Sequence, residues 1–318
     1  MKPISDFIAK KLKASFFLSE KTSKVLSAPA GNMAIKNAIL DAKPTMICRL
    51  GFVEAAAAKN FLEMREYESL NPFAQIRARF GRFQKKWATK HLSELHLNAG
   101  VFPEGEAIAN QFCEFYLHEL GSADILGSFH SLNAEGFLHK MNCPEAIRVD
   151  ATSLEPYYHL DPWSAALERK SVLVVHPFAK TILEQFDRRK TIFPGTNVLP
   201  EMKVKVIRSV QSMCGTIVEF DTWFDALQSM KEEMEQVDFD VCIVGAGAYG
   251  LPLCAHAKRM GKISIQMGGA TQILFGIRGG RWDKYIPAIS SLYNENWTRA
   301  DESDRPLGYQ KIEEGCYW

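Results

Sequence analysis

The sequence predicts an α/β fold with a doubly wound, mostly parallel sheet. Three observations support this prediction. Short apolar runs of strand-forming residues alternate along the chain with stretches of helical period, and several of the runs end in glycine-containing loops. Alternating strands and helices are accommodated most economically by a parallel sheet that is covered by helices on both faces.

Composition indicates an ordinary globular protein. The chain has 318 residues, of which 47% are hydrophobic and 24% charged, enough for one large core. Its 38 basic and 37 acidic residues leave a net charge of +1, which argues against nucleic acid as a partner. The seven cysteines contain no CxxC pair, so we expect reduced thiols in a reducing compartment.

The N-terminal residues, 1–45, are expected to form a helical segment packed on the core. Apolar side chains at Ile4, Phe7, Ile8 and Leu12 share one helical face with lysines nearby. The alternative is a weak peripheral contact with the inner face of a membrane. Because the chain has neither a signal-peptide stretch nor about 18 consecutive apolar residues, we expect a soluble, cytoplasmic protein without a transmembrane segment.

Residues 46–318 are expected to form a single α/β domain with a helical insertion at about 60–120. Strands are predicted at 46–50, 124–129, 171–176, 203–210, 239–245 and 262–267. Helices are predicted at 33–42, 54–67, 104–120, 179–189, 223–236 and 251–260. Gly261 closes the last of these helices, which forms a βαβ unit with the strands on either side.

The segment 71–97 is the most basic part of the chain, and its lysines and arginines are interleaved with aromatic residues. One hypothesis makes it a lid or an acceptor-binding face. The alternative is an amphipathic helix with a solvated cationic side.

The strongest motif follows the strand predicted at 239–245. It reads Gly245-Ala-Gly-Ala-Tyr-Gly250, in which Gly245, Gly247, Tyr249 and Gly250 are candidate phosphate-binding residues. Glycines let the backbone approach a diphosphate, and a helix N-terminus favours its negative charge. Gln266 stands where a dinucleotide site needs an acidic residue, so an NAD or FAD site is an alternative, and a purely structural turn is another.

A second glycine loop follows the next strand and offers Gly268, Gly269, Arg278 and Arg281 as candidates for phosphate binding. Neighbouring parallel strands end at the same edge of a sheet, where open α/β folds bind ligands. A guanidinium group can hold phosphate oxygens in two-pronged fashion. The alternative is that both arginines pair with surface carboxylates.

Other strand ends contribute candidate catalytic residues at the same edge. Arg49, Gly51 and Glu54 follow the first strand, and Glu54 is the candidate for an acid/base or sugar-orienting role. The alternative makes Glu54 a helix-dipole partner with Arg49 as its ion-pair mate. His176 ends another strand as a candidate base, and Asp221 is a further carboxylate to consider.

Together, the Arg49, Gly51 and Glu54 pattern and the late Gly-x-Gly-x-x-Gly-x-Pro unit resemble the bacterial GT-D-type glycosyltransferases. The resemblance runs with gaps over about 47–282 and implies a Rossmann-like, GT-D-like fold that binds a sugar nucleotide. It also implies a role in surface-polysaccharide or adhesin glycosylation.

At one position the chain departs from the pattern of this family. The resemblance implies Asp-x-Glu at the first strand end, associated with a divalent metal, but this chain has Phe52 in place of the Asp. A phenylalanine has no oxygen for Mg²⁺ or Mn²⁺. The arginines replace the charge of the metal, or a carboxylate such as Asp221 joins Glu54 as a ligand, or the site has lost catalysis.

We therefore expect a glycosyltransferase-like protein that binds a UDP-sugar donor and transfers a hexose to a glycan or lipid-linked acceptor, without a firmly held metal. A nicotinamide- or flavin-dependent oxidoreductase is the alternative enzyme class. A non-catalytic, degenerate transferase that binds a partner is the other alternative. The sequence indicates neither the acceptor nor the oligomeric state.

Overall fold

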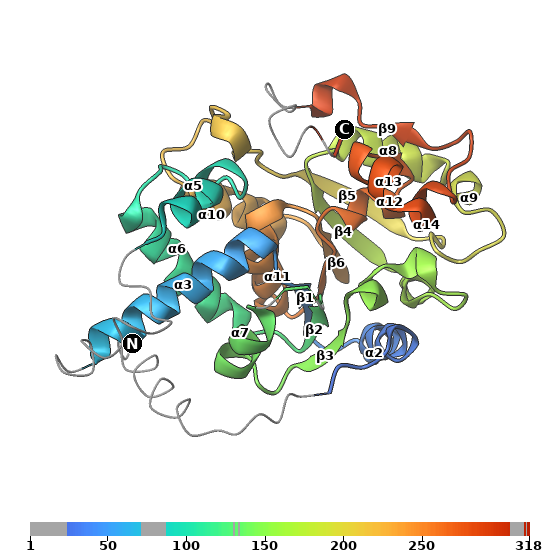
Figure 1. Ribbon diagram of the computed structural model, residues 1–318. Coiled ribbons are helices and arrows are strands. Elements are labelled where there is room, and N and C mark those ends of the chain that lie inside the picture. The colour runs from blue at the N-terminus through green and yellow to red at the C-terminus, as the bar shows by residue number, and fades with distance from the viewer. Residues whose placement is uncertain (1–23, 71–86, 130, 133, 306–314, 316) are drawn as a thin grey trace.

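The computed structural model describes residues 24–70, 87–129, 131–132, 134–305, 315 and 317–318. Its centre is a seven-stranded sheet in the order β3-β2-β1-β7-β6-β4-β5, in which every neighbouring pair is parallel (Figure 1). The strands are β1 Thr45–Arg49, β2 Ile125–Ser128, β3 Ile147–Asp150, β4 Ser171–His176, β5 Lys203–Arg208, β6 Val241–Val244 and β7 Ile263–Gln266. The predicted α/β fold class is confirmed.

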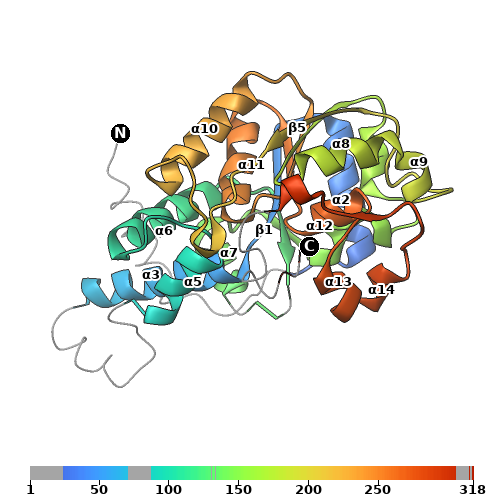
Figure 2. The same cartoon turned by 90° about the horizontal axis from the view of Figure 1, so that it is seen from above.

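Helices cover both faces of the sheet (Figures 1 and 2). On one face lie α3 Phe52–Ser69, α5 Thr89–Leu97, α6 Glu106–Leu120, α7 Glu135–Asn142, α10 Trp223–Glu235 and α11 Gly250–Arg259. On the other lie α2 Ala28–Asp41, α8 Ala179–Asp187, α9 Arg189–Ile192, α12 Ala270–Leu274, α13 Gly280–Tyr285 and α14 Pro287–Ser290. The short strands β8 Ile277–Arg278 and β9 Thr298–Arg299 pair separately.

The two layers of helices explain why the interior strands of the sheet read as mainly apolar runs. In β6, Cys242 and Val244 pack into the core on one face, and Val241 and Ile243 pack into the core on the other. All four side chains are fully buried. Strands with two buried faces carry continuous apolar runs and no alternation with polar residues.

The strand β3 was not predicted, because it is short and mixed in sequence. It lies at the edge, pairs only with β2 within the sheet, and begins with Ile147, which is 48% exposed. Its sequence, Ile-Arg-Val-Asp, lacks an apolar run. The 3-10 turns η1 Ala151–Leu154 and η2 Pro156–Tyr158 follow it.

The connections that follow neighbouring strands of the sheet leave toward opposite faces. The helices α3 and α11, which follow β1 and β6, pack on one face, whereas α8 and α12, which follow β4 and β7, pack on the other. In open α/β sheets, such a divergence leaves a crevice beyond the carboxyl ends of the strands. The fold therefore places β1, β7, β6 and β4 around one opening.

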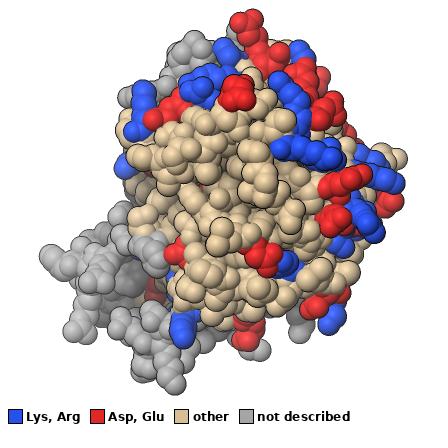
Figure 3. Space-filling model, turned by 90° about the vertical axis from the view of Figure 1, so that its right-hand side faces the viewer, with Lys and Arg blue, Asp and Glu red and all other residues tan. Residues whose placement is uncertain are grey.

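Two predicted segments fall wholly or partly outside the described residues. The N-terminal amphipathic helix with its membrane contact lies within 1–23, and most of the basic segment lies within 71–86. Within the part that the structure does describe, no helix is long and apolar enough to cross a membrane. On the face drawn in Figure 3, charged side chains lie mainly around the outline, and the centre is uncharged.

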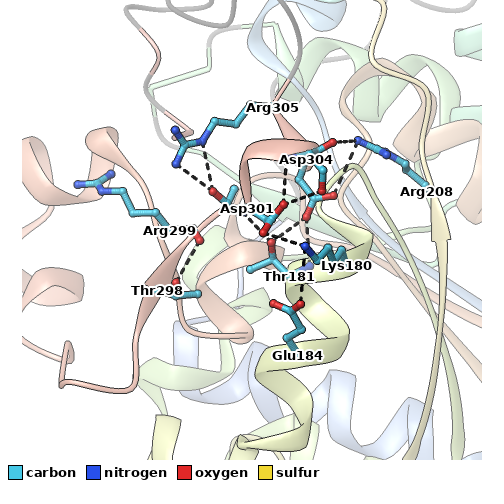
Figure 4. Close-up of polar contacts among 11 residues, drawn as sticks. Lys180, Thr181, Glu184, Arg208, Thr298, Arg299, Asp301, Asp304 and Arg305 are labelled. Atoms are coloured by element: carbon cyan, nitrogen blue, oxygen red, sulfur yellow. Dashed lines mark hydrogen bonds and ion pairs between the residues drawn. The ribbon is translucent and has the colours of Figure 1, made fainter.

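The segment after β9 is fastened to the start of α8 by a buried carboxylate (Figure 4). Asp304 is 1% exposed and accepts hydrogen bonds from the backbone N–H of Thr181 at 3.1 Å and from its hydroxyl at 2.7 Å. Arg208, at the end of β5, lies 3.8 Å from the other carboxylate oxygen. This cluster ties α8, β5 and the segment after β9 together.

We expect Asp304→Ala to lower the free energy of unfolding by about 1–3 kcal/mol, because it leaves a buried backbone N–H, a hydroxyl and a guanidinium group without their acceptor. Urea unfolding of the variant beside the parent protein measures the loss. Glu302→Ala is the control, since Glu302 is exposed two residues away. Equal stability of the two variants would contradict a fastening role for Asp304.

Candidate functional site

A cavity of about 370 Å³ lies beyond the carboxyl ends of the central strands. Its volume falls in the range of small-ligand sites. Residues predicted from separate strand ends line it together, namely Arg49, Gly51, Glu54, His176, Gly245, Gly247, Tyr249, Gly268, Gly269 and Arg281. Gly250, Arg278 and Asp221 are absent from the lining.

Gly245 is the most crowded position of the first glycine loop. A Cβ there would lie 2.5 Å from Cδ2 of His176, 2.6 Å from Oγ1 of Thr271 and 2.8 Å from the carbonyl oxygen of Gly268. Glycine is therefore required for the ends of β4, β6 and β7 to approach one another. Gly247 differs, because it has a φ of +51° and no atom near its Cβ position, so it needs glycine for its backbone conformation.

A short 3-10 turn lies between the end of β6 and the start of α11. The 3-10 turn η5 Gly247–Tyr249 precedes the helix, and the N–H of Gly250 is bonded to the carbonyl of Gly247. Gly250 lies behind this turn, where a Cβ would be 2.9 Å from Nε2 of Gln266. The loop lines the cavity through residues 245–249, whereas Gly250 serves the packing of the helix on β7.

The side chain of Tyr249 belongs to the core. Its ring stacks on Trp223 with centroids 4.8 Å apart, and its hydroxyl lies 2.9 Å from Oγ of Ser212. Since that Ser212 hydroxyl donates to the carbonyl of Gly100, the Tyr249 hydroxyl is the donor in the pair. Tyr249 therefore anchors the wall of the cavity, and its hydroxyl is not available to a phosphate.

Arg49, the last residue of β1, lies close to three other residues. Its Nη1 lies 3.1 Å from Oε1 of Glu155, and both side chains are only 14% exposed. Its guanidinium carbon lies 5.3 Å from the centre of the Phe129 ring, and a Cβ on Gly268 would be 3.0 Å from its Nη2. The expected alternative pairing of Arg49 with Glu54 is wrong, because the partner is Glu155.

Glu155 also accepts a hydrogen bond of 2.8 Å from the hydroxyl of Tyr157. Burial, and then the negative charge of Glu155, raise the pKa of Tyr157. Sequence reasoning missed this carboxylate because it follows the unpredicted edge strand β3, in a turn without a motif. Glu155 sets the orientation of Arg49 toward the glycine loop at Gly268.

Glu54 lies in the first turn of α3 and is 8% exposed. Its carboxylate folds back on the backbone, since a Cβ on Gly51 would lie 2.0 Å from Oε2. No basic side chain pairs with it among the described residues. Burial raises the pKa of Glu54 despite a hydrogen bond from its own backbone N–H, so this acid retains its proton to higher pH than an exposed glutamate.

His176 ends β4 inside the cavity wall. Its Nδ1 accepts a 3.0 Å hydrogen bond from the backbone N–H of Phe178, so the neutral ring carries its proton on Nε2. Burial lowers the pKa of His176 to about 3. The group is therefore a neutral hydrogen-bond donor, and this geometry favours ligand contact over the predicted role as a base.

Arg278 and Arg281 share one loop but lie in different surroundings. Arg281 lines the cavity, with its guanidinium carbon 4.8 Å from the centre of the Tyr317 ring. Arg278 lies outside the lining, over Tyr293 at 4.9 Å and 3.8 Å from a carboxylate oxygen of Asp283. For Arg278, the alternative of a carboxylate partner is therefore correct.

The residues of the cavity do not fit a divalent cation. Phe52 occupies the position of the expected Asp, is 51% exposed, and lies with its ring centre 5.5 Å from that of Phe129. Asp221 is exposed and absent from the lining. Among the described residues, no three His, Cys, Asp or Glu side chains are grouped as metal ligands.

Three further polar side chains in the lining were not predicted. Oγ of Ser209, Nε2 of Gln211 and Oε1 of Gln266 are buried and have no hydrogen-bond partner within the described part of the chain. Buried polar atoms without partners are rare in native proteins and mark places where a ligand or water supplies the bond. In the sequence, only their positions just after β5 and at the end of β7 indicate that these residues could belong to the site.

The low pKa of His176 predicts a specific pH dependence. The unfolded chain, with an ordinary value of 6.5, takes up a proton below that pH, whereas the folded protein does not until about pH 3. Stability is therefore lost as the pH falls, by about 2 kcal/mol between pH 7 and pH 5. Urea unfolding at both pH values should show a smaller loss for His176→Gln, and an unchanged loss would refute the assignment.

Crowding at Gly245 predicts that Gly245→Ala lowers the free energy of unfolding by about 1–3 kcal/mol, because a Cβ cannot be placed without moving three neighbouring groups. Thermal or urea unfolding measures the change. Gly136→Ala is the matched control, since Gly136 lies within α7 with no atom near its Cβ position. That variant should be at least as stable as the parent protein.

Comparisons with known proteins identify the family of the chain. A solved structure titled as domain of unknown function 1792 shares 12% sequence identity, with 84% of this chain and 83% of that chain covered and a TM-score of 0.42. No curated protein sequence matches the chain. A family model described as a GT-D fold-like domain matches residues 32–274, from α2 to α12. Because this match covers most of the protein, the chain belongs to the GT-D-like family.

Proposed function

We propose that the cavity binds a UDP-sugar and that the protein transfers the hexose to a glycan or lipid-linked acceptor in bacterial surface polysaccharide or glycoprotein biosynthesis. The observation that carries this proposal is the convergence of two arginines, Arg49 and Arg281, with two glycine loops on one cavity. Guanidinium groups and closely approaching backbone suit a diphosphate. Membership of the GT-D-like family supports a transferase-like use of the site.

In this proposal the diphosphate lies between the glycine loops, with Arg49 and Arg281 facing its oxygens. An acceptor hydroxyl oxygen bonds to the anomeric carbon and gives its proton to the Glu54 carboxylate or to an oxygen of the diphosphate. The bond from that carbon to the diphosphate breaks, and the diphosphate leaves with the electron pair. The two arginines stabilise the charge that develops on the leaving group. The Nε2–H of His176 donates to a ligand oxygen.

Glu54 is the candidate for acid/base chemistry at the anomeric carbon. Its raised pKa brings the carboxyl closer to neutral pH, where exchange of a proton with a reacting hydroxyl or phosphate oxygen is most effective. In its alternative role, Glu54 orients the sugar through a hydrogen bond from the same position in the cavity lining.

The oxidoreductase alternative is less well supported. A dinucleotide site needs an acid at the end of the strand after the glycine loop, and Gln266 ends β7 at that place. The glycine loop also contains the additional turn η5 before its helix. A non-catalytic binding protein is the other alternative, and binding without turnover would favour it.

We expect UDP to bind the purified protein and Arg281→Gln to weaken that binding about tenfold or more, because one charge-assisted hydrogen bond contributes about 1.5–3 kcal/mol. Arg278→Gln, three residues away and outside the cavity, should change the dissociation constant by less than about twofold. Isothermal titration with UDP and with UDP-hexoses measures both, and thermal unfolding checks that the variants are folded.

The absence of UDP and UDP-hexose binding at millimolar ligand, with and without Mn²⁺, would refute the proposed function. Binding of NAD(P)H or a flavin in the same titration would support the oxidoreductase alternative. Equal effects of the two arginine variants would contradict the assignment of Arg281 to the diphosphate.

A further inference from the structure

We propose that the cavity binds the diphosphate of its ligand without a divalent cation, and that Phe52 is the residue that excludes the cation. This inference rests on the proposed function, because it concerns how the same site holds a nucleoside diphosphate. It goes beyond that function by replacing the metal, which the family resemblance implies, with side chains of this chain.

The position of Phe52 is the first observation that supports this inference. It is the first residue of α3, directly after the glycine that caps the helix at the end of β1, and its ring lines the cavity. The ring is half exposed and lies beside Phe129, over which the Arg49 guanidinium also lies. An apolar pair thus takes up the space where a carboxylate would present oxygen to Mg²⁺ or Mn²⁺.

The remaining carboxylates of the lining, Glu54 and Glu155, are each held by groups of the protein and do not form a shared cation site. The Glu54 carboxylate is folded against the backbone at Gly51, and that of Glu155 is engaged by Arg49 and Tyr157. A divalent cation held by protein needs at least one or two carboxylates facing the phosphates. Neither carboxylate meets this need in the described arrangement.

The groups that do face the cavity are suited to an anion. Arg49 and Arg281 contribute guanidinium groups, His176 contributes its Nε2–H, and Gln211 contributes a buried amide nitrogen without a partner among the described residues. Guanidinium groups bind phosphate oxygens directly and in two-pronged geometry. The lining therefore offers guanidinium groups and hydrogen-bond donors to the phosphate oxygens, the role that a metal otherwise plays for a diphosphate.

Titration of the parent protein with UDP tests the inference directly. We expect the dissociation constant in EDTA to lie within about twofold of the value in millimolar Mn²⁺, and we expect no protein-bound Mn²⁺ signal in electron paramagnetic resonance with UDP present. Binding that requires Mn²⁺ would overturn the inference while leaving the proposed function in place. Failure to bind UDP in either condition would overturn both.

The variant Phe52→Asp tests the role assigned to Phe52. We expect it to acquire Mn²⁺ binding in the presence of UDP and to bind UDP about tenfold more tightly with Mn²⁺ than in EDTA. An aspartate at the first position of α3 is compatible with the helix dipole, and thermal unfolding verifies that the variant folds.

Phe52→Leu is the matched control, because it remains apolar and offers no oxygen. It should stay indifferent to Mn²⁺, whatever its affinity for UDP. Acquisition of Mn²⁺ dependence by Phe52→Leu, or its absence in folded Phe52→Asp, would show that Phe52 is not the residue that excludes the cation.

Discussion

The close approach of three strand ends at Gly245 is the constraint on which the cavity depends. A side chain at this position would overlap the ring of His176, the hydroxyl of Thr271 and the backbone of Gly268. Because these groups belong to β4, α12 and the loop after β7, any added atom would push apart the elements that form the floor of the site. The same closeness buries His176, which keeps its imidazole neutral.

A second set of contacts, next to the floor of the cavity, orients the guanidinium group of Arg49. Arg49 is held by Glu155 and by the face of Phe129, and it lies close to Gly268. An arginine fixed in this way loses less side-chain entropy when a ligand binds than a mobile one does. The ion pair with Glu155 therefore orients Arg49 more than it stabilises the fold, since a buried ion pair contributes little to the net free energy of unfolding.

The fold could be predicted from sequence where burial is complete. The inner strands read as uninterrupted apolar runs because they have helices on both faces, as Val241–Val244 illustrates. The edge strand β3 could not be recognised, because its four residues mix Ile and Val with Arg and Asp. Edge position alone is not the reason, since the other edge strand, β5, was predicted. Glu155 was missed with β3, and so was the true partner of Arg49.

The sequence by itself determined the α/β class, the strands of the sheet interior and the strand ends that bear glycine, arginine, histidine and glutamate. These features depend only on the local sequence, because apolar runs mark the strands and the residue types that follow each run mark the strand ends. Only the tertiary structure decided which of these residues meet. It placed Arg281 in the cavity lining and Arg278 outside it, paired Arg49 with Glu155, and set Phe52 beside Phe129, because each of these outcomes depends on packing between segments that are far apart in the chain.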